Sequence, residues 1–117
     1  MTDAKELHFL LDSAGALIVF QETDASWASV LAFSSEERAQ AFIKRSNLDV
    51  AEIASISARD TDSISELVRN VKRRAVRNLL LDLDYASGEC VAIEFEGDAL
   101  GISHEHRLSP GAHARKH

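Results

Sequence analysis

Two aspartates at the end of an apolar run have the spacing that first suggests chemistry. Asp82 and Asp84 follow leucines in the segment LLLDLDYASG, residues 79–88. Several phosphoryl-transfer enzymes present a nucleophilic aspartate and a metal-binding one in this way, after a buried strand. The same pattern also arises where two polar residues lie on the solvent-facing side of a strand. The pair is therefore either a catalytic centre or a solvated strand face.

The surroundings of the pair favour the solvated strand face. The arrangement resembles the first motif of the haloacid dehalogenase family, in which a Thr or Val stands where this chain has Ala86. That motif opens its domain and leads to a helix, whereas here it lies near the end of the predicted domain and enters a tight turn. No later Lys or acidic metal-binding motif follows. Because short motifs mean little outside their structural context, we predict no catalytic residues and no cofactor.

The predicted pairing of the last two strands sets the direction of the acids. A turn at ASG gathers six apolar side chains on the core face: Leu79, Leu81, Leu83, Val91, Ile93 and Phe95. In this register Leu79 lies opposite Phe95. Successive side chains in a strand point to opposite faces, so Asp82, Asp84 and Glu94 face outward. Hard divalent cations bind clustered carboxylates, and these three acids form the alternative hypothesis of a metal site.

Cys90 is the only cysteine and falls on the same outer face as the two aspartates. A negative field disfavours the thiolate, so we predict an unreactive, half-buried thiol. A single cysteine cannot form an internal disulfide, and the start of the chain, MTDAKELHF, has no signal-peptide pattern. Both features indicate a reducing, cytoplasmic setting.

Basic side chains form two further groups. Arg69, Arg73 and Arg77 lie on the outer face of the second predicted helix, where they could bind an acidic partner. The helix dipole and the nearby Glu66 account for these arginines without a partner. Imidazoles near the end of the chain could chelate a transition metal, but a tail has no second shell to fix its ligands: His104, His106, His113 and His117.

The composition predicts one folded domain. A chain of 117 residues, 45% hydrophobic and 27% charged, is long enough to bury a single core. The formal charge of −6 argues against nonspecific nucleic-acid binding, which depends on surplus Lys and Arg. No apolar run approaches the length of a membrane span.

The first third of the chain predicts three strands and a helix. Apolar residues alternate over residues 7–11, the turn residues DSAG follow, and ALIVFQ and WASVLAF complete a three-stranded antiparallel meander. The segment SSEERAQAFIKRSN, residues 34–47, is a predicted helix in which Ser34 can cap the amide of Glu37. Acidic residues stand in its first turn and basic residues in its last turn, as the helix dipole favours. Asn47 is the predicted end of this helix.

The remaining elements are a strand at 50–57, a helix at 61–78 and two closing strands at 78–85 and 90–96. One stripe of the helix is apolar: Ile64, Leu67, Val68, Val71 and Ala75. We predict an α+β domain over residues 1–100, with a mostly antiparallel sheet of about six strands and two helices on one face. Residues 101–117 are predicted to be a polar, His-rich, mobile tail.

The meander predicts a second apolar face. If Leu11 pairs with Ala16, one face collects core residues: Leu7, Phe9, Leu11, Ile18, Phe20 and Val30. The reverse face then collects Leu10, Leu17, Val19, Trp27 and Leu31. With both helices on the core face this patch is bare, so we predict that a second copy of the chain or another protein covers it. Alternatively, one helix crosses to that side, or the tail folds over it.

The segment VLAFSSEERAQAFI resembles small bacterial domains related to the SseB N-terminal region. A strand ending in Phe33 meets Ser34 and Ser35, then Glu36 and Glu37, then an alanine and Phe42. The resemblance implies an α+β module without identifiable catalytic residues. The predicted function is therefore a non-catalytic protein-binding or assembly module, forming a homodimer through the reverse sheet face. The alternative is a small metal-dependent enzyme or divalent-ion-binding protein that uses the carboxylates of the closing hairpin.

Overall fold

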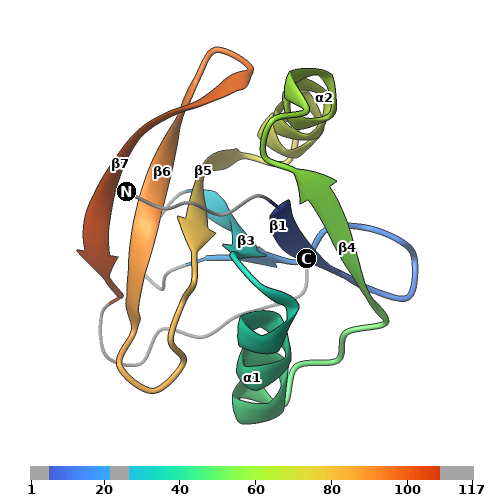
Figure 1. The fold of residues 1–117 in the computed structure, drawn as a ribbon, viewed down its shortest axis with the longest axis vertical. Coiled ribbons are helices and arrows are strands. Elements are labelled where there is room, and N and C mark those ends of the chain that lie inside the picture. The colour runs from blue at the N-terminus through green and yellow to red at the C-terminus, as the bar shows by residue number, and fades with distance from the viewer. Residues whose placement is uncertain (1–5, 22–26, 109–117) are drawn as a thin grey trace.

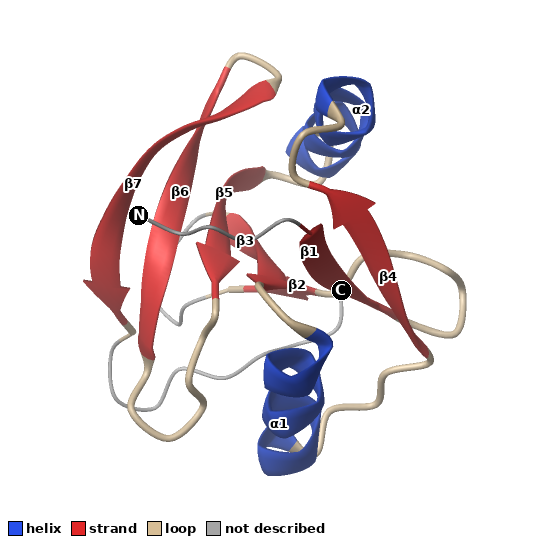
Figure 2. Cartoon of the chain, viewed as in Figure 1, coloured by secondary structure: helices blue, strands red, loops and turns tan. Residues whose placement is uncertain are grey.

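The protein folds as a seven-stranded sheet with a helix on either side (Figures 1 and 2). The computed structural model describes residues 6–21 and 27–108. The strands are β1 (Glu6–Leu11), β2 (Val19–Phe20), β3 (Ala28–Phe33), β4 (Glu52–Ser57), β5 (Val76–Leu81), β6 (Glu89–Glu96) and β7 (Ala99–Arg107). The helices are α1 (Glu36–Ser46) and α2 (Thr61–Lys72). The strand order is β4-β1-β3-β5-β6-β7, with β2 beside β3. The predicted α+β class and mostly antiparallel sheet are confirmed.

The two helices cover opposite faces of the sheet, so the prediction that both lie on one face is wrong. The strands β3, β4 and β5 run parallel, because β1 is antiparallel to both β3 and β4. The crossover through α1 moves from β3 outward to β4, and the crossover through α2 moves back past β1 to β5. Crossovers are almost always right-handed. Two that move in opposite directions must therefore place their helices on opposite faces, as Figure 1 shows.

The first hairpin differs from the prediction by one residue in register. Leu11 pairs with Leu17 instead of Ala16, and the amide of Asp12 donates to the carbonyl of Ala16 at 2.9 Å. A one-residue slip sends every side chain of a strand to the other face. Ile18 therefore lies with Leu10 on the α1 side, and Val19 lies on the α2 side.

Each face of the sheet carries its own apolar core. The α2-side core is Leu7, Phe9, Val19, Ala28, Val30, Ala32, Ile64, Leu67, Val68, Val71, Val76, Leu79 and Leu81. The α1-side core is Leu10, Ile18, Phe20, Leu31, Phe33, Ala39, Phe42, Leu80, Leu83, Cys90, Ala92 and Leu108. From Val30 to Phe33, consecutive residues of β3 alternate between the two lists. A sheet buried on both faces explains why this strand reads as a continuous apolar run in the sequence.

The helix ends follow local capping chemistry, with two differences from the prediction. The N-cap of α1 is Ser35 rather than Ser34, and its hydroxyl accepts from the Arg38 amide at 3.2 Å. The predicted end at Asn47 is confirmed, with a left-handed φ of 56°. The second helix ends at Lys72 instead of continuing to residue 78. Ala75 has a φ of 62°, a conformation that no helix interior accepts.

Residues 101–108 are part of the domain, so the predicted boundary between a domain at 1–100 and a tail is wrong. Strand β7 pairs with β6 over most of its length, and Leu108 is buried in the α1-side core. The alternation that marks a half-buried strand is weak in β7, because most of its side chains are exposed. Neither α1 nor α2, the helices of the described ranges, is long and apolar enough to cross a membrane.

Candidate functional site

Asp82 holds two elements together instead of facing open solvent. Its carboxylate accepts hydrogen bonds from the amide and the hydroxyl of Ser34, at 2.8 and 2.7 Å. Its own amide donates to the carbonyl of Ala32 at 2.9 Å, and its φ is 56°. The left-handed turn ends β5 and aims the carboxylate at the start of the β3–α1 connection. The role of Asp82 in this geometry is structural.

The structure does not bring Asp82, Asp84 and Glu94 together as a metal site. Asp84 is exposed and caps the turn, accepting from the Ala86 amide at 3.0 Å. Glu94 pairs with Asn78 instead, because the closing hairpin sets Leu79 opposite Ile93, two residues from the predicted register. The described residues contain no group of three or more His, Cys, Asp or Glu side chains that could hold a metal ion.

The five residues predicted as an interface do not form one exposed face. Leu10 and Leu31 are fully buried in the α1-side core, while Val19 is buried on the α2 side. Leu17 packs against the α2-side core, and Trp27 is half-buried. The structure realises the alternative in which a helix crosses to the reverse face. The predicted homodimer therefore loses the surface on which it depended.

The predicted arginine patch is divided among different elements. Arg69 on α2 lies 3.8 Å from the carboxylate of Asp98, in the turn between β6 and β7. Arg73 follows the last residue of the helix and is exposed. Arg77 belongs to β5, on the far side of the turn that ends the helix. The three side chains therefore do not share one surface.

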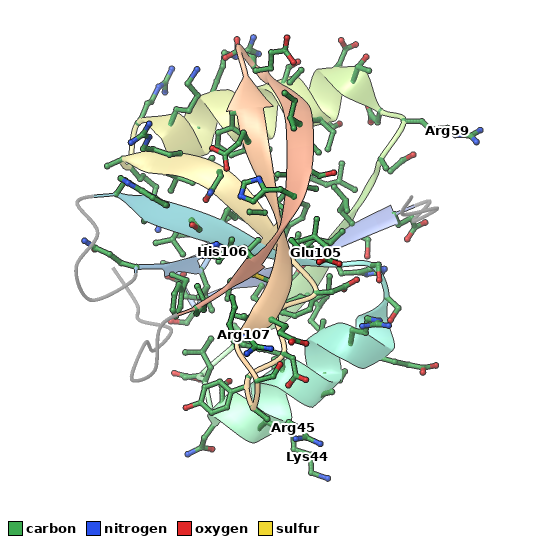
Figure 3. All side chains as sticks on the ribbon, turned by 90° about the vertical axis from the view of Figure 1, so that its left-hand side faces the viewer. Lys44, Arg45, Arg59, Glu105, His106 and Arg107 are labelled. Carbon is green, nitrogen blue, oxygen red and sulfur yellow. The ribbon has the colours of Figure 1, made fainter. Side chains whose placement is uncertain are left out.

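The thiol and the imidazoles singled out in the sequence also have definite places. Cys90 is buried, with 7% of its surface exposed, which is deeper than the half-buried position predicted. His104 and His106 lie on β7 with ring centroids 6.3 Å apart. Figure 3 shows that His106 and Glu105 extend to opposite sides of this strand. His113 and His117 fall outside the described residues.

A chain of polar side chains crosses the α1 side of the sheet, and sequence reasoning missed it. The hydroxyl of Ser29 on β3 donates to the amide oxygen of Asn78 on β5 at 2.5 Å. The amide nitrogen of Asn78 donates to Glu94 Oε2 on β6 at 3.2 Å. Ser29 and Asn78 are buried, with exposures of 4% and 5%. Burial of a polar group is costly unless the group is hydrogen-bonded. Here the buried side chains of Ser29 and Asn78 bond to each other inside the sheet.

A β-bulge turns Arg77 toward the same pocket as Asn78. Ala28 pairs with Val76, but the next residue, Ser29, pairs with Asn78, so Arg77 is an extra residue in β5. Val76 belongs to the α2-side core, whereas Arg77 and Asn78 both line one pocket on the other side. The guanidinium carbon of Arg77 lies 5.5 Å from the ring centre of Trp27. Bulges are rare between parallel strands and often re-aim a side chain near a functional site.

A second irregularity lies beside Glu94. Ile93 pairs with Ser103 and Phe95 with Leu100, so Glu94 faces two residues of β7 rather than one. One of the two, Gly101, has no room for a side chain, because a Cβ there would lie 2.9 Å from the Cβ of Glu96. The polar chain is therefore flanked by a bulge on β5 and another on β7.

These side chains line a pocket of about 270 Å³. Its walls are Trp27, Ser29, Arg77, Asn78, Leu80, Ala92, Glu94, His104 and His106. Two opposite charges, on Arg77 and Glu94, face this space above an apolar floor of Leu80 and Ala92. Pockets that combine aromatic and apolar walls with a few convergent polar groups are typical binding sites.

A larger hollow of about 570 Å³ lies at the ends of β5, β6 and β7 and shares His106 with this pocket. Four of its charged side chains are used in other contacts. Asp82 and Asp84 hold turns, and Arg107 forms an ion pair with Glu89. The smaller pocket, which has paired buried polar groups beneath it, is the stronger candidate site. We call it the Trp27 pocket.

No protein-family model, curated protein or solved structure matches the chain. The resemblance to the SseB N-terminal region therefore stays a prediction. The signals for the Trp27 pocket in the sequence were single polar residues in apolar strands, Ser29 in WASVLAF and Asn78 in VRNLLL. Only the pairing of β3, β5 and β6 brings Ser29, Asn78 and Glu94 together.

Proposed function

We propose that the protein is a non-catalytic binding module whose ligand site is the Trp27 pocket. The observation that carries the proposal is the hydrogen-bonded series Ser29–Asn78–Glu94. Its first two members are buried, and it shares its pocket with an arginine that a bulge turns toward Trp27. A purely structural sheet would gain as much from apolar residues at these positions, since replacing paired buried groups by apolar ones is often nearly neutral. Buried polar residues and strand bulges depart from what a stable sheet needs, and such departures usually mark a functional site when they cluster in one pocket.

Binding fits the pocket better than catalysis does. The Ser29 hydroxyl donates a hydrogen bond to the amide oxygen of Asn78. An amide oxygen is not a general base, so the Ser29 hydroxyl is not activated as a nucleophile. The alternative metal-dependent enzyme has lost its support, because Asp82 is held by Ser34 and Glu94 by Asn78. The unactivated hydroxyl of Ser29 and the engaged carboxylates of Asp82 and Glu94 both support a site that holds a ligand without transforming it.

The test uses the single tryptophan of the chain. Trp27 lines the pocket, so its fluorescence should change saturably when a ligand enters. We would screen amino acids, nucleosides, sugars and small carboxylates, and map each hit by amide chemical shifts in ¹H–¹⁵N spectra. The proposal expects the shifts to gather at residues 27–29, 77–80, 92–94 and 104–106.

The control is a variant in the neighbouring hollow. Arg38 lines that hollow and not the Trp27 pocket, so Arg38→Gln should leave the affinity unchanged. Shifts that gather around Asp82 and Arg38, or a hit whose affinity falls in Arg38→Gln, would move the binding site away from Trp27. The proposal would also be wrong if no compound in the screen bound at millimolar concentration.

A further inference from the structure

We infer that the ligand of the Trp27 pocket is a small zwitterion, of the size of an amino acid, that carries both a carboxylate and an ammonium group. This inference rests on the proposed function, since it names the class of ligand for the same site. Its basis is a pair of opposite charges in one small pocket, each with hydrogen-bonding capacity left over.

Arg77 supplies the positive end of the site. Its guanidinium carbon lies 5.5 Å from the centre of the Trp27 ring, a cation–π contact that does not use its N–H groups as hydrogen-bond donors. Towards the described residues it makes no hydrogen bond or ion pair. A guanidinium has five donors arranged as a fork that fits a carboxylate in a bidentate manner. A ligand carboxylate is therefore the group that Arg77 is best placed to bind.

Glu94 supplies the negative end. Only Oε2 is engaged by Asn78, and Oε1 receives no hydrogen bond from the residues that the structure describes. The contact with Asn78 fixes the orientation of the carboxylate, and the bulge on β7 sets Glu94 against two residues of that strand rather than one. An ammonium group has three donors and no acceptor, so it matches the free oxygen of Glu94.

The charges and the size of the pocket disfavour simpler ligands. A dianion such as phosphate would be repelled by Glu94, and a cation without an acid group would be repelled by Arg77. The volume of about 270 Å³ is smaller than the roughly 300–1,000 Å³ of pockets for drug-sized ligands. Leu80 and Ala92 form an apolar floor that suits the carbon atoms of a small side chain.

The experiment is a Trp27 fluorescence titration of the full chain with free amino acids and with their blocked forms. Glycine, alanine, serine, leucine, glutamate and lysine would each be compared with the N-acetyl derivative and the carboxamide. We expect saturable binding of at least one free amino acid. Each blocked form removes one charge, so its affinity should fall at least tenfold. Amide chemical shifts would confirm that the bound amino acid lies at residues 27–29 and 92–94.

Variants of the two charged residues test the same inference from the protein side. Arg77→Gln and Glu94→Gln should each weaken binding at least tenfold, and Arg77→Lys should weaken it less than Arg77→Gln. Matched controls remove the same charges elsewhere: Arg59→Gln and Glu66→Gln lie outside the pocket and should leave the affinity unchanged. Glu94→Gln keeps an oxygen for Asn78, so its ¹H–¹⁵N spectrum should match that of the wild type.

The outcomes separate this inference from the proposed function. If blocked and free amino acids bind equally well, or if Arg77→Gln and Glu94→Gln bind normally, the zwitterion inference is overturned. If none of the amino acids binds but another compound class shifts the same amides, the inference is overturned while the binding module stands. If no compound shifts these amides, both fail.

Discussion

Asn78 accepts a hydrogen bond from Ser29 at 2.5 Å across the only parallel pair in the described sheet, β3 and β5. The two side chains are buried, and neither would be stable there alone. The amide nitrogen of Asn78 donates a second hydrogen bond to Glu94, so Ser29 on β3 and Glu94 on β6 are linked through a single side-chain amide. The strength of this linkage can be measured.

Replacement of Asn78 alone should destabilise the protein more than replacement of Asn78 together with Ser29. Asn78→Leu leaves Ser29 and Glu94 without a partner, and we expect a loss of about 1–3 kcal/mol in the free energy of unfolding. The double variant Ser29→Ala, Asn78→Leu removes one orphaned group and should regain part of the loss. Urea denaturation of the wild type, both single variants and the double variant gives the coupling energy. Strictly additive effects would mean that the linkage contributes nothing.

The two aspartates of the closing hairpin should differ sharply. Asp82→Ala removes two hydrogen bonds to Ser34 and places a Cβ-only side chain at a φ of 56°, so we expect a loss of about 1–3 kcal/mol. Asp84→Ala removes one contact at an exposed turn and should cost less than about 1 kcal/mol. Thermal unfolding of the two variants makes the comparison. Equal losses would contradict the structural role of Asp82.

Strand β7 should protect Cys90. Cys90 is buried and pairs with His106, so a thiol reagent should react with the native protein much more slowly than with the protein in urea. A chain that ends at Leu100 lacks the partner of Cys90, and its thiol should react nearly as fast as the unfolded reference. Because the chain has one cysteine, the reaction has a single phase to interpret. A fast native reaction would show that β7 does not cover this face.

The start of α2 should weaken in acid. Asp60 caps this helix, and hydrogen bonds from the side chain and backbone of Ser63 hold its pKa below the ordinary value of 3.8. A carboxyl group whose pKa falls on folding contributes stability above its unfolded pKa and loses that contribution as the pH drops through the folded pKa. The difference in urea midpoint between wild type and Asp60→Ala should therefore be constant near neutral pH.

Below pH 3.8 this difference should shrink. The control is Asp60→Asn, which keeps an oxygen for the Ser63 amide but does not titrate over this range. Its difference from the wild type should also change only in acid. A midpoint difference for Asp60→Ala that stays the same down to pH 2 would rule out this origin.

The sequence by itself determined where most elements lie. The first three strands, the first helix up to Asn47 and the closing strands follow from local periodicity, turn residues and capping, which act over a few neighbouring residues. The predicted three-stranded meander is wrong, because β1 pairs directly with β3 in the antiparallel sense. The apolar stripe of α2 was predicted and is buried at Ile64, Leu67, Val68 and Val71. Strand β7 was missed because its side chains are mostly exposed, so its sequence carries little of the alternation that marks a strand.

The tertiary structure alone decided which faces these elements share. A slip of one residue at the first hairpin exchanges the two faces of β2, and a local pattern that is apolar on both sides cannot report it. The directions of the crossovers decided that α1 and α2 lie on opposite faces. The Trp27 pocket needs Ser29, Asn78 and Glu94 from three strands and a bulge at Arg77. Such a site exists only through strand pairing, which joins residues far apart in the chain.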